Sequence, residues 1–600
     1  MRDSSVGFSV RYNHTLPLTL ISRPVEIHFV LPRHVLGVSS ALCAHCNHSY
    51  CQNSSTDEQS LTMAFDEEKQ AHTSSSSTAP SPSHHNIVEK LQPSSSVSAA
   101  DASPNGSVQE YNAVFLKHDN SFLRSLRNFE DSLDKKIGVE SQAIVRVKPE
   151  EKRPVKWHEE ANMALLWASG VMQLSCFATG FLGPEFGLSL GQSIAITIFG
   201  TLLGAAVSGF CATMGPATGL RQVSISRYSF GWYPAKIVAA LNVISQIGWS
   251  SVGCITGGQA LSAVSDGKVS LVLGIVIIAV GALVFIFFGL RAILALNKYA
   301  WFIFLVLFLV MYGEAAPHAD AAAPASVEGR ALSGSALSLL AIVYGSSASW
   351  SSIASDYYAH YPVNTSKVKV FSLTTLGITV PTCIGMVLGC CVGSAFATNP
   401  QWADTYDNDG IGFLVQTIIH PIGFAKFLLV IFVLAGISMN CINMYSAALS
   451  VQQFARPVSL IPRFIWTVVI FGVVLAIALA GRNNLLTVLE NLLALLGYWN
   501  TSFFVIVFTE HIVFRKSNIG NYDLEGWNDP SRLPIGIAAG TAFIVGVVGW
   551  ILGMVTTWYV GVAAKAITEG GGDIGNQLTL MITLVIFLPL RYWERKKFGR

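Results

Sequence analysis

The sequence predicts an all-α polytopic membrane protein with twelve transmembrane helices. Half of the 600 residues (51%) are hydrophobic, whereas only 12% are Asp, Glu, Lys or Arg, about half the charged share of a soluble domain. The apolar residues gather in runs of about 20, the length that one helix needs to cross a bilayer. These runs lack the alternation of a transmembrane β-barrel, so helices are the expected spanning element.

The charge balance and the motifs exclude several other classes of protein. Lys and Arg together number 38 and Asp and Glu 36, so the net charge of +2 argues against a nucleic-acid binder. No Walker A motif is present, which argues against ATP-driven transport. The cysteines Cys43, Cys46 and Cys51 lack the spacing of a four-ligand zinc site. We therefore expect neither an enzyme, nor a metal site, nor a cofactor.

Residues 1–155 are rich in charge, with 32 of the 74 Asp, Glu, Lys and Arg residues, and are predicted to form a disordered cytosolic tail. Thr73–Ser83 (TSSSSTAPSPS) is of low complexity and has little to bury. Met63 opens a polar stretch typical of a cytosolic start, so residues 1–62 are either part of the tail or a gene-model extension, and both readings stay open. The serines, prolines and lysines of the tail suit phosphorylation and ubiquitin-ligase adaptors as partners.

Twelve apolar segments follow, and they define a transmembrane transporter domain over residues 156–590. The predicted spans are 163–183, 191–213, 237–264, 269–290, 297–313, 335–355, 371–397, 427–450, 464–481, 485–509, 535–558 and 574–590. With the N-terminus in the cytosol, the inner loops hold eleven Lys and Arg residues and the outer loops five. The positive-inside rule therefore places both termini, including the basic segment 591–600, in the cytosol.

Charged residues are rare inside these spans. Glu490 is the one acid that lies fully within a predicted span, and Asp356 lies at the end of the sixth. An acid at membrane depth is a functional candidate by default, although a structural partner would also explain it. We therefore take Glu490 and Asp356 as candidates for ion coupling.

Small and polar residues interrupt spans 1 and 6. Gly170, Gly180 and Pro184 loosen the first, and the run Gly345–Ser352 (GSSASWSS) loosens the sixth. Broken helices at matching positions of two halves indicate a transporter binding site, whereas small residues also serve ordinary helix packing. Their separation by five spans favours the binding site.

Aromatic and amide side chains provide a second signal. Trp249 lies in the third span and Trp350 in the sixth, while Asn440 and Asn443 share one face of the eighth. Indole rings stack on planar heterocycles, and an amide offers both a donor and an acceptor to a ring edge. A buried Asn can instead bridge helices, and a Trp can anchor a helix at the interface.

The order of motifs resembles the fungal purine–cytosine permeases of the nucleobase:cation symporter family. The matching motifs, spread over residues 150–595, are Gly183-Pro184, Gly219-Leu220-Arg221-Gln222, Asn242-Val243-Ile244, Gly248-Trp249, Phe288-Gly289, Ala354-Ser355-Asp356-Tyr357, Asn443-Met444-Tyr445-Ser446, Ile461-Pro462-Arg463, Gly497-Tyr498 and Glu510-His511. The resemblance implies a five-plus-five inverted-repeat fold with two extra C-terminal helices. It also implies proton-coupled import of cytosine and purines across the plasma membrane by alternating access.

The resemblance further implies that Ser175, Trp249, Trp350 and Asn443, with Asn440, bind the substrate. Three departures stand out. Gly253 replaces an Asn of the relatives, Ser438–Asn443 (SMNCIN) replaces A-N-N-I-P-N, and Asn297-Lys298 lacks the usual acid before the Lys.

A pocket without one amide is expected to lose hydrogen-bond discrimination. The alternatives are therefore a transporter of another small heterocycle, such as pyridoxine, or a non-transporting nutrient sensor on the same fold. The sequence leaves the coupling ion open between a proton and sodium.

Overall fold

The computed structural model describes residues 145–600 except 153, 157–159, 289, 455 and 460, together with the isolated positions 125 and 132. Most of the predicted tail therefore lies outside the described residues. Its last part, from residue 145, is described except for residue 153. The short helix η1 (Pro149–Glu151) follows Val147, whose N–H donates to the carbonyl of Gly219 at 2.8 Å.

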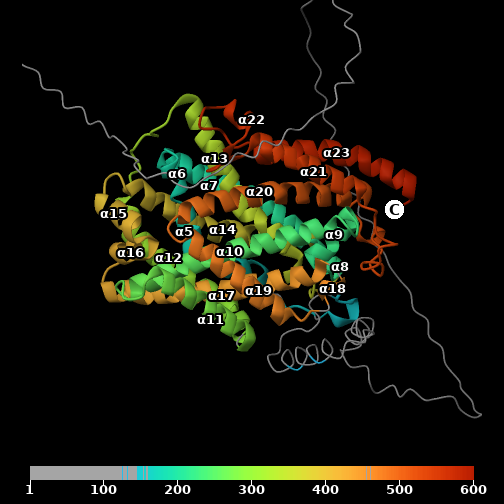
Figure 1. Cartoon of the computed structure of the whole chain (residues 1–600), viewed down its shortest axis with the longest axis horizontal. Coiled ribbons are helices and arrows are strands. Elements are labelled where there is room, and N and C mark those ends of the chain that lie inside the picture. The colour runs from blue at the N-terminus through green and yellow to red at the C-terminus, as the bar shows by residue number, and fades with distance from the viewer. Residues whose placement is uncertain are drawn as a thin grey trace, which may run out of the picture. The chain divides into compact units, whose positions relative to one another are not determined.

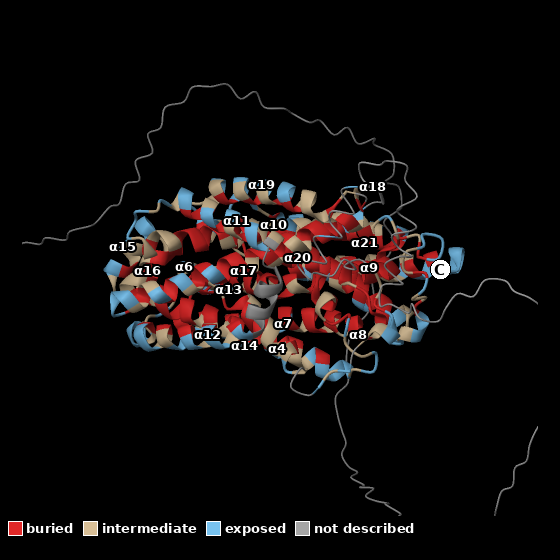
Figure 2. Ribbon diagram, turned by 90° about the horizontal axis from the view of Figure 1, so that it is seen from below, coloured by how far each residue is buried: buried red, intermediate tan, exposed pale blue. Residues whose placement is uncertain are grey.

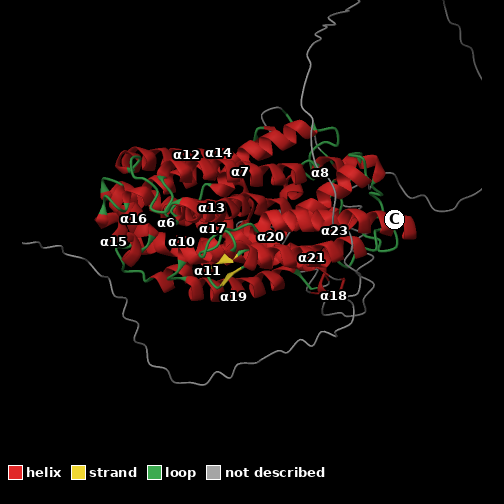
Figure 3. Ribbon diagram, turned by 90° about the horizontal axis from the view of Figure 1, so that it is seen from above, coloured by secondary structure: helices red, strands yellow, loops and turns green. Residues whose placement is uncertain are grey.

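The described chain consists mostly of helices (Figures 1 and 3). The elements of its first half are α4 (Asn162–Val171), α5 (Leu174–Thr179), α6 (Leu182–Glu185), α7 (Leu190–Ala212), α8 (Met214–Thr218), α9 (Gln222–Phe230), α10 (Ala235–Val264), α11 (Leu271–Phe288), α12 (Leu290–Ala315), η2 (Ala316–His318), α13 (Gly329–Ala348), η3 (Ser349–Ser352) and η4 (Ala354–Tyr357).

The elements of the second half are α14 (Lys367–Ala395), α15 (Pro400–Asp409), α16 (Ile411–Ile418), α17 (Ile422–Phe454), α18 (Arg456–Ser459), α19 (Arg463–Gly481), α20 (Leu485–Thr509), the π-helix η5 (Glu510–Phe514), η6 (Ile519–Asn521), α21 (Ile537–Gly553), β1 (Val555–Thr556), β2 (Tyr559–Val560), α22 (Val562–Lys565) and α23 (Gly575–Phe598). The strands β1 and β2 pair antiparallel in a small hairpin.

Each predicted span falls on helical structure. Eight described helices are long and apolar enough to cross a membrane, and a ninth is obtained if the bent pair formed by α4 and α5–α6 counts as one span. The helices α11 and α21 are apolar but shorter, and α23 coincides with the last predicted span. The chain is thus a multi-pass membrane protein with at least eight apolar helices of membrane length.

Both predicted helix interruptions are present. The axis bends by 67° between α4 and α5, because Met172 and Gln173 leave the helical conformation and Gln173 is extended (φ −121°, ψ 161°). The helix α13 ends at Ala348, and the chain continues in the 3-10 turns η3 and η4 on either side of Ile353. Backbone polar groups released inside a membrane need new partners, so such breaks are tolerated where they line a cavity.

Close helix packing holds the two broken spans in place. A Cβ atom on Gly345 of α13 would lie 2.0 Å from the carbonyl oxygen of Leu493 in α20, so no larger residue fits there. A Cβ atom on Gly180, after α5, would lie 2.0 Å from the carbonyl of Met386 in α14. The glycines therefore let backbone pack on backbone at both interruptions, as small residues do in other membrane bundles.

Buried residues fill the interior of the helix bundle (Figure 2). Large hydrophobic side chains are exposed on the outward faces of several helices, including Phe199 of α7, Leu309 of α12, Phe427 of α17 and Ile544 of α21. Such faces suit lipid rather than water. The helices α15 and α16 lie at one end of the bundle, while α8, α9, α18 and the C-terminus lie at the other (Figure 1).

Candidate functional site

A cavity lies where the two broken spans meet α10 and α17. It encloses about 600 Å³ of space not filled by protein atoms, including the part that opens to solvent. It is lined by Gly170, Val171, Gln173, Ser175, Cys176, Thr179, Trp249, Gly253, Thr256, Ser346, Trp350, Thr382, Gly436, Met439, Asn440 and Asn443. The structure therefore brings together all five residues that were predicted to bind substrate. None of these lining side chains is charged, so the cavity suits a neutral molecule.

Two indole rings line the cavity and come from different elements. Trp249 lies in the middle of α10, and Trp350 lies in η3, just after the end of α13. Trp350 packs edge-on against Trp167, with ring centroids 5.3 Å apart. Trp167 is itself fixed, because its Nε1–H donates to Tyr358 Oη at 2.7 Å. The position of Trp350 is thus set by a buried aromatic and hydrogen-bonded group behind it.

The amides of α17 point at the same space. Asn440 is 1% exposed; its Nδ2 donates to Cys254 Sγ at 3.3 Å, whereas its Oδ1 has no hydrogen-bond partner. Asn443 is 2% exposed, and neither atom of its amide has a partner within the described part of the chain. Because an unpaired buried polar atom is costly, these amide groups are available to a bound ligand.

A polar layer between α10, α17 and η3 supports the cavity. The amide of Asn242 donates to Ser450 Oγ at 2.8 Å and accepts from Ser352 Oγ at 2.8 Å. On the far side of η3, Ser351 Oγ donates to Asn500 Oδ1 of α20 at 2.8 Å. These buried residues fix the irregular η3 segment that carries Trp350. Sequence reasoning singled out Asn242 only as part of a family motif and missed its structural role.

The two predicted coupling acids lie away from the cavity. Glu490 is half-buried, close to the start of α20, and does not line it. Asp356 lies in η4, where Oδ2 pairs with Arg221 Nη1 at 3.3 Å and Oδ1 accepts from the N–H of Gln222 at 2.7 Å. Burial raises the pKa of Asp356, and the Arg221 guanidinium opposes this rise. Neither acid can therefore contact a ligand in the cavity in this conformation.

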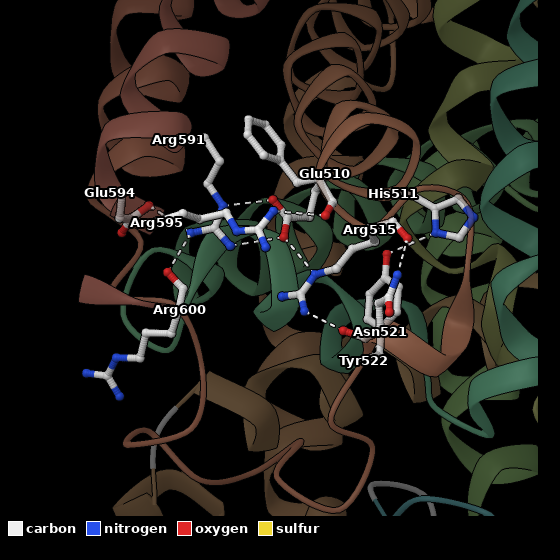
Figure 4. A network of polar contacts seen from close by, with 10 residues as sticks. Glu510, His511, Arg515, Asn521, Tyr522, Arg591, Glu594, Arg595 and Arg600 are labelled. Carbon is white, nitrogen blue, oxygen red and sulfur yellow. Dashed lines mark hydrogen bonds and ion pairs between the residues drawn. The ribbon is translucent and has the colours of Figure 1, made fainter. Parts of the chain in front are cut away.

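Figure 4 shows a buried ion-pair network at the end of the bundle that carries the C-terminus. Arg591 donates to Glu510 through Nε (2.8 Å) and Nη2 (3.0 Å), and to Glu594 through Nη1 (3.2 Å), and all three side chains are fully buried. Arg515 Nε also donates to Glu510 at 2.9 Å. Glu594 accepts from the N–H of Gly536 at 2.7 Å, so the network ties η5 and α23 to the start of α21.

The helix α23 continues to Phe598, so the segment 591–600, which is predicted to be basic and cytosolic, is largely helical and buries Arg591. Glu510 was placed just outside the span 485–509, but the helix continues through η5 as far as Phe514. The sequence signal for the pairing was weak, because Arg591 and Glu510 are 81 residues apart.

A second buried carboxylate contacts the middle of α20. Asp573, just before α23, accepts from the hydroxyl of Tyr498, from the N–H of Gly575 at 2.9 Å and from the N–H of Val555 at 3.2 Å. It thereby joins α20, α23 and the hairpin. Burial raises the pKa of Asp573 to about 6, although these hydrogen bonds act in the opposite direction.

Comparisons with known proteins agree on one family. A family model described as permease for cytosine/purines, uracil, thiamine, allantoin matches residues 147–572. Purine-cytosine permease fcyB of Emericella nidulans is 35% identical over 506 residues, which cover 84% of this chain and 97% of that protein. Vitamin B6 transporter TPN1 of Saccharomyces cerevisiae is 33% identical over 534 residues, which cover 80% and 92%.

Solved structures show a similar fold. The inward-facing conformation of Mhp1 is similar with a TM-score of 0.56 at 17% sequence identity, over 76% of this chain and 96% of that one. A closed conformation of Mhp1, a nucleobase-cation-symport-1 family transporter with bromovinylhydantoin bound, has a TM-score of 0.53 at 18% identity, over 75% and 96%. The fold of the described helices is therefore that of Mhp1.

Proposed function

Because the chain belongs to the family of permeases for cytosine/purines, uracil, thiamine and allantoin, we propose that it is a secondary transporter that imports a neutral nucleobase, cytosine or a purine, together with a proton. Its relatives are transporters and not enzymes. The observation that carries the proposal is the uncharged cavity, in which two indole rings, the unpaired Oδ1 of Asn440 and the amide of Asn443 meet at two broken spans.

Each group has a distinct role in this proposal. The rings of Trp249 and Trp350 pack on the faces of a planar heterocycle, a contact that depends little on which atoms lie at its edge. The Asn443 amide pairs with the ring edge, since it can donate and accept at once. Ser175 adds a hydroxyl from α5, next to the break. Stacking supplies affinity for planar rings, and the amides select among them.

The transport cycle follows from the breaks in α4–α5 and α13–η3. In the proposed topology the chain crosses the plasma membrane twelve times, as a five-plus-five inverted repeat with two extra helices, and both termini are cytosolic. Alternating access then moves the broken spans around a fixed cavity. The grouping of α8, α9, α18 and the C-terminus at one end of the bundle supports this orientation.

The coupling ion is proposed to be a proton, carried by Asp356 or Glu490 outside the cavity. Sodium is the alternative, because carbonyl groups at a broken helix can bind it without a carboxylate. Uptake that is abolished by an uncoupler but unaffected by replacement of sodium supports proton coupling. Uptake that follows sodium and survives the uncoupler contradicts it.

One feature of the cavity favours a second candidate substrate, a pyridoxine-like heterocycle. Gly253 stands where relatives place an Asn, and a Cβ atom on it would lie 2.9 Å from Asn440 Oδ1. The glycine therefore leaves both space and an unpaired acceptor on one wall of the cavity. A hydroxymethyl group would fill that space and donate to the acceptor. The similarity to a vitamin B6 transporter also supports this alternative substrate.

Uptake in cells that lack their own nucleobase and vitamin B6 permeases tests the proposal. Labelled cytosine, adenine, hypoxanthine and pyridoxine are offered separately, and the signal is normalised to surface protein. Accumulation of at least one nucleobase is expected. Accumulation of pyridoxine alone favours the second candidate. A surface-localised protein that accumulates none of the four favours a nutrient sensor on the same fold and contradicts the transporter.

A further inference from the structure

A small apolar recess adjoins the central cavity. It shares three lining residues with that cavity, namely Gly170 of α4, Trp350 of η3 and Met439 of α17. Its surface is almost wholly apolar, and within the described part of the chain Ser169 and Tyr357 are its only polar lining residues. The recess therefore extends the central cavity by a space that offers a ligand few hydrogen bonds.

A glycine lies between the indole and the thioether where the cavity meets the recess. A Cβ atom on Gly170 would lie 3.7 Å from Trp350 Cη2 and 3.9 Å from Met439 Cε. Both are ordinary van der Waals distances, so an alanine fits at this helical position without displacing its neighbours. The absent side chain of Gly170 therefore leaves a gap between Trp350 and Met439, and an alanine would fill it.

One wall of the recess is fixed by its contacts, and another can adapt. Trp167 is buried, its ring packs edge-on against Tyr357 with centroids 4.9 Å apart, and its Nε1–H is bonded to Tyr358 Oη. Met439 is half-buried and has an unbranched, flexible side chain. The recess has room for a group of about the size of a methyl. Because apolar spaces hold water poorly, a methyl group fills such a recess more favourably than a water molecule does.

We propose that the recess is a subsite for a methyl substituent on the ring of the substrate, entered between Trp350 and Met439 over Gly170. This inference rests on the proposed function, because it requires a planar heterocycle in the central cavity with one face against Trp350. The part of the ring edge that lies beside Gly170 then faces the recess, while another part meets the amides. The preferred substrates are therefore methylated heterocycles, a class that includes thymine, 5-methylcytosine and pyridoxine.

Dissociation constants of the purified full-length protein, measured by calorimetry in detergent, test the subsite without any transport measurement. Three pairs of ligands differ by one methyl group: thymine and uracil, 5-methylcytosine and cytosine, and pyridoxine and 2-norpyridoxine. Burial of one methyl group is worth about 4-fold in affinity, so the methylated member of at least one pair should bind about 4-fold more tightly. Gly170→Ala should reduce the ratio of the two dissociation constants in that pair to about one, because the new methyl group occupies the gap.

Two further variants sharpen the test. Met439→Ala enlarges the recess and should extend the preference from a methyl to an ethyl group at the same ring position. Gly472→Ala is the matched control, because Gly472 is a helical glycine of α19 whose added Cβ would have nothing within 4 Å. This control should keep the wild-type ratio in every pair.

The outcomes separate the subsite from the proposed function. Binding of the parent rings with no preference for any methylated partner would overturn the subsite and leave the proposed function intact. An equal loss of affinity for both members of a pair in Gly170→Ala would mean that Gly170 serves the fold or the main cavity, and would also overturn the subsite. Binding of no member of any pair would contradict both the subsite and the proposed function.

Discussion

Replacement of Asn443 by Ala is the most informative single change in the proposed substrate site. The side chain is 2% exposed, lines the central cavity, and makes no hydrogen bond to any described residue. Its removal therefore breaks no hydrogen bond to a described residue. If the amide pairs with the ring edge of the substrate, its loss leaves substrate groups unpaired in a dry site. The cost is about 1–3 kcal/mol, or roughly 5- to 150-fold in affinity.

Competition uptake, normalised to surface protein, measures this loss across a panel of purines and pyrimidines. Asn443→Ala should raise the inhibition constants unequally, because each ring presents different donors and acceptors. Trp249→Ala is the comparison, since loss of a stacked ring should weaken binding of all planar rings to a similar extent. An unchanged set of inhibition constants for Asn443→Ala, with less protein at the surface, would mean that Asn443 serves the fold and not the substrate.

Three further predictions concern stability, pH and selectivity. Glu510→Gln weakens a fully buried ion pair with Arg591 and should lower the free energy of unfolding by about 3–5 kcal/mol. The variant in detergent should then aggregate at a lower temperature than the wild-type protein, and an unchanged melting curve would contradict this. Burial raises the folded-state pKa of Asp573 to about 6, so the folded protein binds this proton more tightly than the unfolded chain does. The free energy of unfolding should therefore fall by about 3 kcal/mol as the pH rises from about 4 to 6. Asp573→Asn should flatten that part of the stability–pH curve, and an unaltered slope would exclude the effect. Gly253→Ala should displace the Asn440 side chain, because the new Cβ would lie 2.9 Å from Asn440 Oδ1. The ratio of the inhibition constants of pyridoxine and hypoxanthine should change as a result. A constant ratio would mean that residue 253 does not take part in substrate selection.

The sequence was sufficient for the architecture and for the composition of the central cavity. Runs of apolar residues indicate the spans, and clusters of Gly, Ser and Pro indicate breaks in the helices. The interruptions at Gln173 and after Ala348 were therefore predictable. The five predicted binding residues meet because four spans carry them at similar depth. The exact paths of these spans, and hence lining residues such as Thr382 and Met439, depend on packing between distant segments and were missed.

Long-range polar pairing was beyond sequence reasoning. The ion pair of Glu510 and Arg591 joins residues 81 positions apart, and the contact between Tyr498 and Asp573 joins residues 75 positions apart. In the sequence, Glu510, Arg591 and Asp573 look like isolated charges near the ends of spans. Their partners can be identified only once the helices α20 and α23 are placed side by side. For the same reason the ion pair of Asp356 with Arg221, 135 residues away, became visible only in the folded chain.

The most direct test of the proposed function is uptake by the purified protein in proteoliposomes with an acidic outside and a neutral inside. The proposal predicts that labelled cytosine or a purine accumulates inside above its outside concentration, that the accumulation disappears when a protonophore removes the gradient, and that it does not require sodium. Proteoliposomes that contain folded protein, respond to neither gradient and accumulate neither a nucleobase nor pyridoxine would contradict the proposal that this chain is a transporter of small heterocycles.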